Sequence, residues 1–271
     1  MQNTIFKDQV VWVTGASSGI GAAMARDFAK RGAKVILTAR RVERLQELAN
    51  ELGPNAKILP ADLGILSELP VLAEKATALF GRIDVLFNNA GYSQRSFVAD
   101  TPFEFEKKVV EVDLLSPMAL TKAVLPQMMA RKSGRILVTS SLMGYLELPG
   151  NATYSCVKHA LNGYFYSLAY EVQQHGILVQ VIEPGFVKTE VTLSAITASG
   201  KPHGKMDATH AKAMSAEEFS RRTFKKLEKN KAEIIVAGPE RFAVYVRWWF
   251  PCLYRFAIHR FAMRFFKDRF Q

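Results

Sequence analysis

Tyr154 and Lys158, in the segment YSCVKHALNGY at 154–164, have side chains and a spacing that could exchange a proton. Residues four apart lie on one face of a helix, so a phenol and an ammonium group so spaced can approach one site together. A neighbouring positive charge favours the ionised form of a phenol, whose ordinary pKa is about 10. The pair is therefore a candidate for acid–base chemistry near neutral pH, and the alternative is a solvated polar helix face.

A glycine-rich segment, TGASSGIGAAMA at 14–25, follows an apparent strand and begins an alanine-rich helix. Glycines there let the backbone approach a pyrophosphate, while the helix N-terminus offers unpaired N–H groups and a partial positive charge. This context favours a dinucleotide site over a simple tight turn. The predicted cofactor-binding residues in the segment are Gly15, Ser17, Ser18, Gly19, Ile20 and Gly21.

The next apparent strand ends in LTARRVERL, which bears on the choice of nucleotide. An acidic residue at this point would hold the ribose 2′-hydroxyl, whereas an arginine would accept a 2′-phosphate. Ala39 occupies the position of the acidic residue, and Arg40 and Arg41 follow it. The segment therefore predicts NADP(H) binding, with the alternative that both arginines only begin a solvated helix.

Seven short segments rich in β-branched residues alternate with segments of helix length, and they must position these features. Such alternation predicts an α/β fold in which a doubly wound, seven-stranded parallel sheet is covered on both faces. The ligand crevice is then expected at the carboxyl ends of the strands. Residues 1–240 form one expected domain of Rossmann type, followed by a C-terminal helical extension at 241–271. The predicted strands are 10–14, 34–39, 57–61, 84–89, 135–141, 178–184 and 233–238.

Four motifs in this order resemble those of the short-chain dehydrogenase/reductase (SDR) family over about residues 8–240. They are TGASSGIG, NNAG at 88–91, YSCVK, and EPGFVKT from Glu183 to Thr189. The resemblance implies a carbonyl/alcohol oxidoreductase and assigns Asp62 to the adenine end of the cofactor. It also implies that the last motif folds over the nicotinamide. The further cofactor-binding residues that it implies are Leu63, Asn89, Ala90, Gly91, Tyr154, Lys158, Pro184, Gly185, Val187 and Thr189.

The resemblance also gives roles to the candidate catalytic residues. Tyr154 would donate a proton to a carbonyl oxygen, or remove one from an alcohol in the reverse direction. Lys158 would lower the pKa of the phenol and hold the cofactor ribose. Ser141 lies thirteen residues before Tyr154 and would polarise the same oxygen by a hydrogen bond. Ser140 is disfavoured, because alternate residues of a strand face opposite sides.

One position departs from the family pattern. Asp113, in VEVDLLSP, stands where the family usually has an asparagine that helps to hold a water between the lysine and solvent. An ionised carboxylate accepts hydrogen bonds but cannot donate one. Asp113 is therefore a fourth candidate catalytic residue. It could pair with Lys158 and weaken its effect on Tyr154, carry protons itself, or be a tolerated substitution.

The positive charge of the chain, +11 overall, is concentrated near its C-terminus. Residues 201–271 hold 16 Lys+Arg and 7 Asp+Glu, compared with 20 and 18 in residues 1–200. The two cysteines, Cys156 and Cys252, lie in unlike surroundings and suggest a reducing compartment without a structural disulfide or a metal site. The beginning of the chain resembles no signal peptide, and no apolar run is long enough to span a membrane. A cytoplasmic location is expected.

The extension at 241–271 contains 11 aromatic residues and 7 Lys+Arg, and Pro251 should divide it into two helices. Basic residues beside bulky aromatics suit a helix that lies on an anionic membrane surface. The same residues could instead cover the substrate cleft or join subunits of a homo-oligomer, a dimer or tetramer. Nucleic acid is disfavoured as a partner, because no recognisable binding module accompanies the charge.

The sequence as a whole predicts an NADP(H)-dependent oxidoreductase. Its small-molecule substrate would be an apolar carbonyl or secondary alcohol, of the steroid, retinoid, lipid or another ketone class. The loop from about Val187 to Ser215 should line the substrate pocket. The competing hypotheses are a cofactor-binding scaffold or regulator of the same fold with little turnover, and a basic protein that binds nucleic acid.

Overall fold

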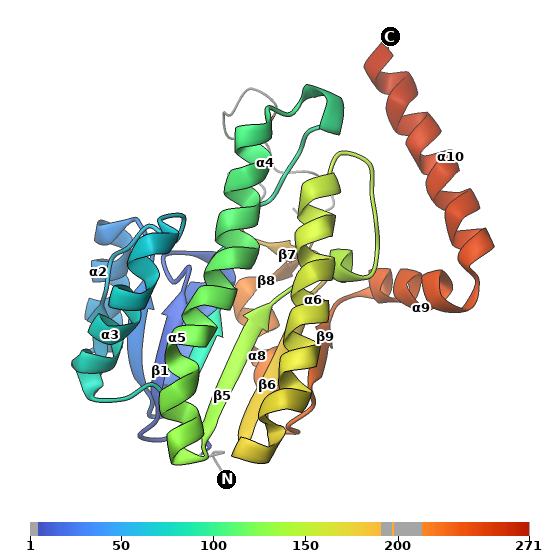
Figure 1. Ribbon diagram of the computed structural model, residues 1–271. Helices are drawn as coiled ribbons and strands as arrows, with labels where there is room; N and C mark the ends of the chain where they lie inside the picture. Colours follow the sequence, from blue (N-terminus) through green and yellow to red (C-terminus); the bar gives the residue numbers. More distant parts are fainter. Residues whose placement is uncertain (1–4, 191–196, 198–212, 271) are drawn as a thin grey trace.

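A parallel sheet forms the centre of the molecule (Figure 1). The computed structural model describes residues 5–190, 197 and 213–270, with the backbone alone for 264–270. The seven strands lie in the order β3-β2-β1-β4-β5-β6-β9, and every neighbouring pair is parallel. Their bounds are β1 (Val10–Thr14), β2 (Lys34–Thr38), β3 (Ala56–Ile58), β4 (Val85–Asn88), β5 (Gly134–Thr139), β6 (Ile177–Pro184) and β9 (Glu233–Val236).

Helices cover both faces of this sheet, as the alternating sequence pattern predicts. Alternate residues of β1 enter opposite cores, with Val11 and Val13 in one and Val10 and Trp12 in the other. The first core is closed by α1 (Gly19–Lys30), α2 (Val42–Leu52) and α8 (Ala216–Leu227). The second is closed by α3 (Leu69–Phe80), α5 (Ser116–Arg131) and α6 (Ala152–Val172). The predicted doubly wound fold is thus confirmed.

The strand order reverses between β1 and β4. The chain runs outward from β1 to β3 and then returns to place β4 on the other side of β1. At such a switch point the loops after the two strands diverge and leave a crevice at their carboxyl ends. The loops that begin at Gly15 and Asn89 both border this crevice.

The remaining described elements surround that edge of the sheet. Helix α4 (Phe103–Val110) is joined to α5 by a π-helical turn at Glu111–Leu115, and a 3₁₀ turn at Leu142–Gly144 follows β5. A small parallel pair, β7 (Val187–Lys188) and β8 (Met214–Ser215), flanks the crevice. The other 3₁₀ turns are Leu66–Glu68, Val98–Asp100, Gln173–His175 and Pro239–Arg241.

The C-terminal extension forms two helices, α9 (Phe242–Trp249) and α10 (Pro251–Phe270), so the predicted division at Pro251 is confirmed. Figure 1 shows α10 projecting from the body of the molecule beyond α9. The beginning of the extension packs on the molecule, since Val244 and Tyr254 share an apolar cluster with Leu142 and Leu146.

Five of the seven predicted strands end earlier in the structure, and β3 and β5 are two of them. β3 ends at Ile58 rather than at residue 61, although the backbone N–H groups of Leu59 (2.9 Å) and Ala61 (3.2 Å) still donate to carbonyls at the end of β2 and just after it. β5 ends at Thr139 rather than at Ser141, because Ser141 begins the following 3₁₀ turn as its N-cap. Both differences affect residues at the crevice.

Candidate active site

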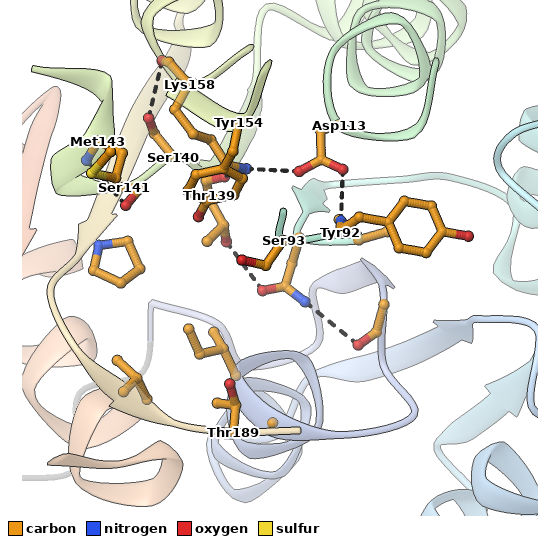
Figure 2. Close-up of a pocket in the computed structure, with 18 of the residues that line it drawn as sticks. Tyr92, Ser93, Asp113, Thr139, Ser140, Ser141, Met143, Tyr154, Lys158 and Thr189 are labelled. Carbon is orange, nitrogen blue, oxygen red and sulfur yellow. Dashed lines mark hydrogen bonds and ion pairs between the residues drawn. The ribbon is translucent and has the colours of Figure 1, made fainter. Parts of the chain in front are cut away.

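A cavity of about 670 Å³ opens at the carboxyl ends of the central strands. It brings together the glycine-rich turn, the predicted catalytic residues and the beginning of the C-terminal extension, and Figure 2 shows its centre. Gly21 is the one predicted site residue that does not line it, because it lies beneath the glycine-rich turn. The predicted residues that do line it are Gly15, Ser17, Ser18, Gly19, Ile20, Arg40, Arg41, Asp62, Leu63, Asn89, Ala90, Gly91, Asp113, Ser141, Tyr154, Lys158, Pro184, Gly185, Val187 and Thr189.

The glycine-rich turn can form a cradle only because Gly15 and Gly21 have no side chain. Gly15 has a φ of +65°, and a Cβ there would lie 2.8 Å from the Cα of Ala90. A Cβ on Gly21 would lie 2.2 Å from the carbonyl oxygen of Gly15. These contacts hold the turn against the loop after β4 and expose the N-terminus of α1 to the cavity. The arrangement fits the pyrophosphate of a dinucleotide.

Arg41 lies directly on this cradle. Its guanidinium donates to the Ser17 hydroxyl (3.0 Å) and to the Ser18 hydroxyl (2.7 Å), and it forms an ion pair with Glu190 at 2.9 Å. Arg40 instead lies over the ring of Tyr92, 5.4 Å from its centroid. Both arginines are exposed and line the cavity, so two positive charges border the place where a cofactor phosphate would lie.

Two polar residues of the predicted cofactor site have structural contacts as well. Asp62 accepts a hydrogen bond from the backbone N–H of Gly64 (2.9 Å), which forms a tight turn after β3. Asn89 donates to the carbonyl of Thr14 (3.1 Å) and accepts from the Thr139 hydroxyl (3.1 Å). Asn89 therefore ties the ends of β1, β4 and β5 together at the crevice.

Tyr154 and Lys158 lie near the start of α6, with the Lys158 ammonium 5.3 Å from the centroid of the Tyr154 ring. Lys158 is 5 % exposed, and its Nζ donates to the carbonyl of Thr139 at 3.2 Å. Tyr154 is half-buried and lines the cavity. The predicted proximity of phenol and ammonium is thus present in the structure.

The structure distinguishes the two serines after β5. Ser140 is buried, and its hydroxyl donates to the backbone carbonyl of Lys158 (3.3 Å), which holds α6 against β5. The Ser141 oxygen accepts from the backbone N–H of Met143 (3.1 Å), so its own proton remains available to donate. This hydroxyl lines the same cavity as Tyr154 (Figure 2). Ser141 is therefore better placed than Ser140 to polarise a substrate oxygen.

Asp113 lies in the π-helical turn, completely buried next to Lys158. Its Oδ2 is 3.3 Å from the Lys158 Nζ, and its Oδ1 accepts from the backbone N–H of Tyr92 at 2.7 Å. Burial raises the pKa of the Asp113 carboxyl, against the opposing effects of Lys158 and the Tyr92 amide. Gly91 leaves room for this carboxyl, since a Cβ there would lie 2.7 Å from the Oδ2. Of the three interpretations of Asp113, pairing with Lys158 is the one that the geometry supports.

Sequence patterns gave no indication of two further residues that shape the site. Gln94, buried in the loop after β4, accepts from the backbone N–H groups of Thr153 (3.0 Å) and Tyr154 (3.3 Å) and so caps α6. Glu240 accepts from the N–H groups of Gly238 (3.0 Å) and Phe186 (3.1 Å) and so anchors the loop after β6. Each acts across more than fifty residues of sequence, which local spacing does not reveal.

The C-terminal extension forms part of the cavity wall. Ala243, Tyr254 and Ile258 line it opposite the polar residues, together with Leu142 and Met143. Tyr254 is 5 % exposed, and its hydroxyl donates to the carbonyl of Glu147 at 3.2 Å. This packing agrees with the alternative that the extension covers the cleft. The cavity is thus polar on its cofactor side and apolar on the side of α9 and α10.

Part of the predicted pocket loop, 187–215, lies outside the described residues, because 191–196 and 198–212 are not described. Among the residues that the structure describes, no cluster of three or more His, Cys, Asp or Glu side chains could hold a metal ion. The described helices likewise include none that is long and apolar enough to cross a membrane. Cys156 and Cys252 are both free and exposed.

Comparisons with known proteins agree with this architecture. The family model for short chain dehydrogenases matches residues 9–199. The chain is 37% identical over 264 residues to the dehydrogenase/reductase SDR family protein 7-like of Drosophila melanogaster, covering 94% of this chain and 81% of that protein.

Solved structures of this family have the same fold. A short-chain dehydrogenase from Streptomyces avermitilis matches with a TM-score of 0.81 at 28% identity, over 95% of this chain and 98% of that one. A metagenomic short-chain oxidoreductase in complex with NADP matches with a TM-score of 0.71 at 30% identity, over 86% and 98% of the two chains. A Burkholderia phymatum enzyme in complex with NAD shares the fold at 21% identity, with a TM-score of 0.79 over 89% of this chain and 93% of that one. The chain therefore belongs to the short-chain dehydrogenase/reductase family of oxidoreductases.

Proposed function

We propose that this oxidoreductase uses NADP(H) to interconvert a carbonyl and a secondary alcohol on an apolar substrate. The observation that carries the proposal is the common exposure of Tyr154 and Ser141 to one cavity, between a glycine cradle and an apolar wall. A bound nicotinamide cofactor would supply or accept the hydride. The residues of the chain must then bind the substrate oxygen and move its proton.

Tyr154 is the proposed general acid in reduction and the general base in oxidation. Its phenol would give a proton to the substrate oxygen, while the Ser141 hydroxyl donates a hydrogen bond to the same oxygen. The Lys158 ammonium, 5.3 Å from the Tyr154 ring, favours the phenolate that forms when this proton leaves. Asp113 reduces that effect, because its carboxylate forms an ion pair with the same ammonium, with 3.3 Å between Oδ2 and Nζ.

NADP(H) is proposed over NAD(H) because of Arg40 and Arg41. Both border the cradle, and Ala39 before them offers no carboxylate for a 2′-hydroxyl. The position of Arg41 on Ser17 and Ser18 supports a charge-assisted contact with a 2′-phosphate. Relatives of this fold have been solved with either nucleotide, so the two arginines carry this part of the proposal.

The apolar wall supports an apolar substrate. Leu142, Met143, Ala243, Tyr254 and Ile258 would contact the part of the substrate that points away from Tyr154. Steroids, retinoids and lipid-derived ketones share this chemistry.

We further propose that the C-terminal extension meets an anionic membrane surface. Residues 241–263 contain four arginines and no Asp or Glu. Arg255 and Arg260 are exposed, and Arg260 lies 5.7 Å from the centroid of the Phe256 ring. Lipid phosphates attract such cations while neighbouring rings enter the acyl boundary. The large exposed apolar side chains of the extension are Phe242, Tyr245, Trp248, Trp249, Phe250, Leu253, Phe256, Phe261 and Met263.

The proposed activity is tested by following the consumption of NADPH with a panel of steroid, retinoid and long-chain aliphatic ketones. A compound that is reduced by the wild type and not by Tyr154→Phe supports the proposal. Tight NADPH binding without reduction of any compound would instead favour the alternative, a cofactor-binding scaffold with little turnover.

A further inference from the structure

Glu183 is a buried carboxyl at the end of β6, outside the set of proposed catalytic residues. Its side chain is 0 % exposed and precedes Pro184, which lines the cavity. Its Oε1 lies 2.5 Å from the hydroxyl oxygen of Tyr145 and accepts from the hydroxyl of Tyr166 (2.9 Å) and the amide of Asn162 (3.2 Å). Within the described part of the chain, no Lys, Arg or His forms an ion pair with it. A buried carboxyl in such surroundings is far more stable in its neutral form.

The hydrogen bonds of Tyr145 require a proton on one of two carboxyls. Its hydroxyl oxygen lies 2.5 Å from Glu183 Oε1 and 2.6 Å from Glu233 Oε1. A phenol has one proton, and an ionised carboxylate can only accept, so two ionised partners could not both be bonded. Glu233 is exposed on β9, the edge strand, whereas Glu183 is completely buried. The retained proton is therefore assigned to Glu183, which donates to Tyr145, while Tyr145 donates to Glu233.

The groups around Glu183 have opposing effects on its pKa, and their sum favours the neutral form. Burial is the largest cause and Glu233 adds to it, against the hydrogen bonds of Tyr145 and Tyr166, and together they raise the pKa of Glu183 to about 8. Burial and the neighbouring Glu183 also raise the pKa values of Tyr145 and Tyr166, so both phenols stay protonated. Tyr145 lies in the segment after the 3₁₀ turn, Tyr166 on α6 and Glu233 on β9.

The partners of Glu183 belong to the segments that carry the proposed catalytic groups. Tyr145 follows the 3₁₀ turn that Ser141 begins. Asn162 lies one helical turn after Lys158 on α6, and its amide also contacts the carbonyl of Gly144 at 3.4 Å. Glu183 itself leads into Pro184 on the cofactor side of the cavity. The Glu183 carboxyl thus connects the turn after β5, helix α6 and the loop that begins at Pro184.

We propose that Glu183 is a positioning residue that, as a neutral carboxylic acid, holds the Ser141 turn, helix α6 and the Pro184 loop together. The catalytic consequence of this inference rests on the proposed function, whereas the structural role of Glu183 does not. Ionisation would place a second negative charge beside Glu233 through Tyr145 and leave one hydrogen bond of the cluster without a proton. The three segments would then separate, and Ser141 would lose its alignment with Tyr154.

The pH dependence of stability tests the neutral state. The pKa of the Glu183 carboxyl is about 4.5 in the unfolded chain and about 8 in the folded protein. The neutral carboxyl therefore makes its full contribution to the stability of the folded state below about pH 4.5. This contribution is lost as the pH rises through the higher value. Glu183→Gln keeps the shape without a titrating proton, and exposed Glu171→Gln on α6 is the matched control. Unfolding temperatures are measured without cofactor at about pH 5, 7 and 9.

From the lowest to the highest pH, the wild type and Glu171→Gln should lose at least about 4 °C more than Glu183→Gln. Equal losses in all three proteins would overturn the neutral-carboxyl assignment, whether or not the protein proves to be an enzyme. This experiment can therefore contradict the assigned neutral state of Glu183 without bearing on the proposed function.

Kinetics with any ketone that the wild type reduces test the positioning role. The ratio of kcat in Glu183→Gln to kcat in the wild type should rise more than about threefold between pH 6 and pH 9. Tyr145→Phe keeps the ring and removes the bridging hydroxyl, and should lower kcat by about tenfold with a smaller change in KM. A constant ratio together with a wild-type kcat in Tyr145→Phe would overturn the positioning role.

Discussion

The Asp113 carboxylate lies 3.3 Å from the Lys158 ammonium, and both groups are buried beside Tyr154. This pair sets the charge that the Tyr154 phenol experiences. A lysine with only neutral neighbours would exert its full effect on the phenol, whereas here a carboxylate offsets part of it. The pair therefore links the departure from the family pattern at position 113 to the proposed proton transfer.

Asp113→Asn should keep or raise kcat and shift the pH profile toward lower pH. The amide oxygen can still accept from the Tyr92 N–H, while the loss of negative charge strengthens the effect of Lys158 on the phenol. The same change leaves a buried ammonium without its partner, so the free energy of unfolding should fall by about 3 kcal/mol. The measurements are kcat against pH and denaturant unfolding. An unchanged profile at unchanged activity would show that the carboxylate does not act on the proton path.

Tyr154→Phe should lower kcat by at least about 100-fold, because it removes the hydroxyl that carries the transferable proton. The dissociation constant for NADPH should stay within about threefold of the wild type, since the ring and Lys158 remain. Exposed Tyr170→Phe on the same helix is the control and should leave both quantities unchanged. Retained turnover in Tyr154→Phe would remove this residue from its role.

Arg40→Ala and Arg41→Ala should each weaken NADPH binding, with a smaller effect on NADH. Loss of one charge-assisted contact to a 2′-phosphate corresponds to about 10- to 100-fold in the dissociation constant. Arg41 should have the larger effect, because it lies on the Ser17 and Ser18 hydroxyls while Arg40 lies over Tyr92.

The control for both variants is Arg44→Ala on α2, an exposed arginine 3.7 Å from Glu47. Its affinities for both nucleotides should equal those of the wild type. If the wild type binds NADH as tightly as NADPH, the proposed cofactor preference is wrong.

Much of the fold followed from local patterns in the sequence. Short apolar segments at 10–14 or 34–39 predict buried strands from composition alone, and alternation with helices then fixes a parallel sheet. Tyr154 and Lys158 were predictable for the same reason, since four residues on one helix suffice to place them together. Strand ends were less predictable, because features such as the cap at Ser141 act at single residues.

The supporting contacts of the site could not be predicted in this way. Gln94 reaches the start of α6 from a loop fifty-nine residues earlier, and the Tyr145 hydroxyl contacts both Glu183 and Glu233 from segments far apart in the sequence. A buried carboxyl in a strand of apolar residues looks like an ordinary polar residue until its neighbours are known. Such contacts depend on tertiary packing, which the spacing of residues along the sequence does not predict.

The boundary between a catalytic domain at 1–240 and an extension at 241–271 stays a proposal, and it affects how the extension can be tested. Removal of all of 241–271 would also remove Tyr254, which is buried and lines the cavity. Substitutions of exposed residues are therefore the sharper test of membrane binding. Trp249, Phe250 and Phe256 are 76 %, 62 % and 59 % exposed.

A triple variant with serine at Trp249, Phe250 and Phe256 should lose most of its co-sedimentation with vesicles of phosphatidylcholine and phosphatidylserine. Burial of three such rings contributes several kcal/mol, and their loss should weaken binding by more than about 100-fold. Phe103→Ser, which changes a 75 % exposed ring on α4, is the control and should sediment like the wild type. Raised salt or vesicles of phosphatidylcholine alone should weaken wild-type binding, because the arginines then lose their attraction to lipid phosphates. If the wild type stays in the supernatant at low salt while the triple variant changes from a dimer or tetramer to a monomer in light scattering, these rings join subunits and do not bind lipid.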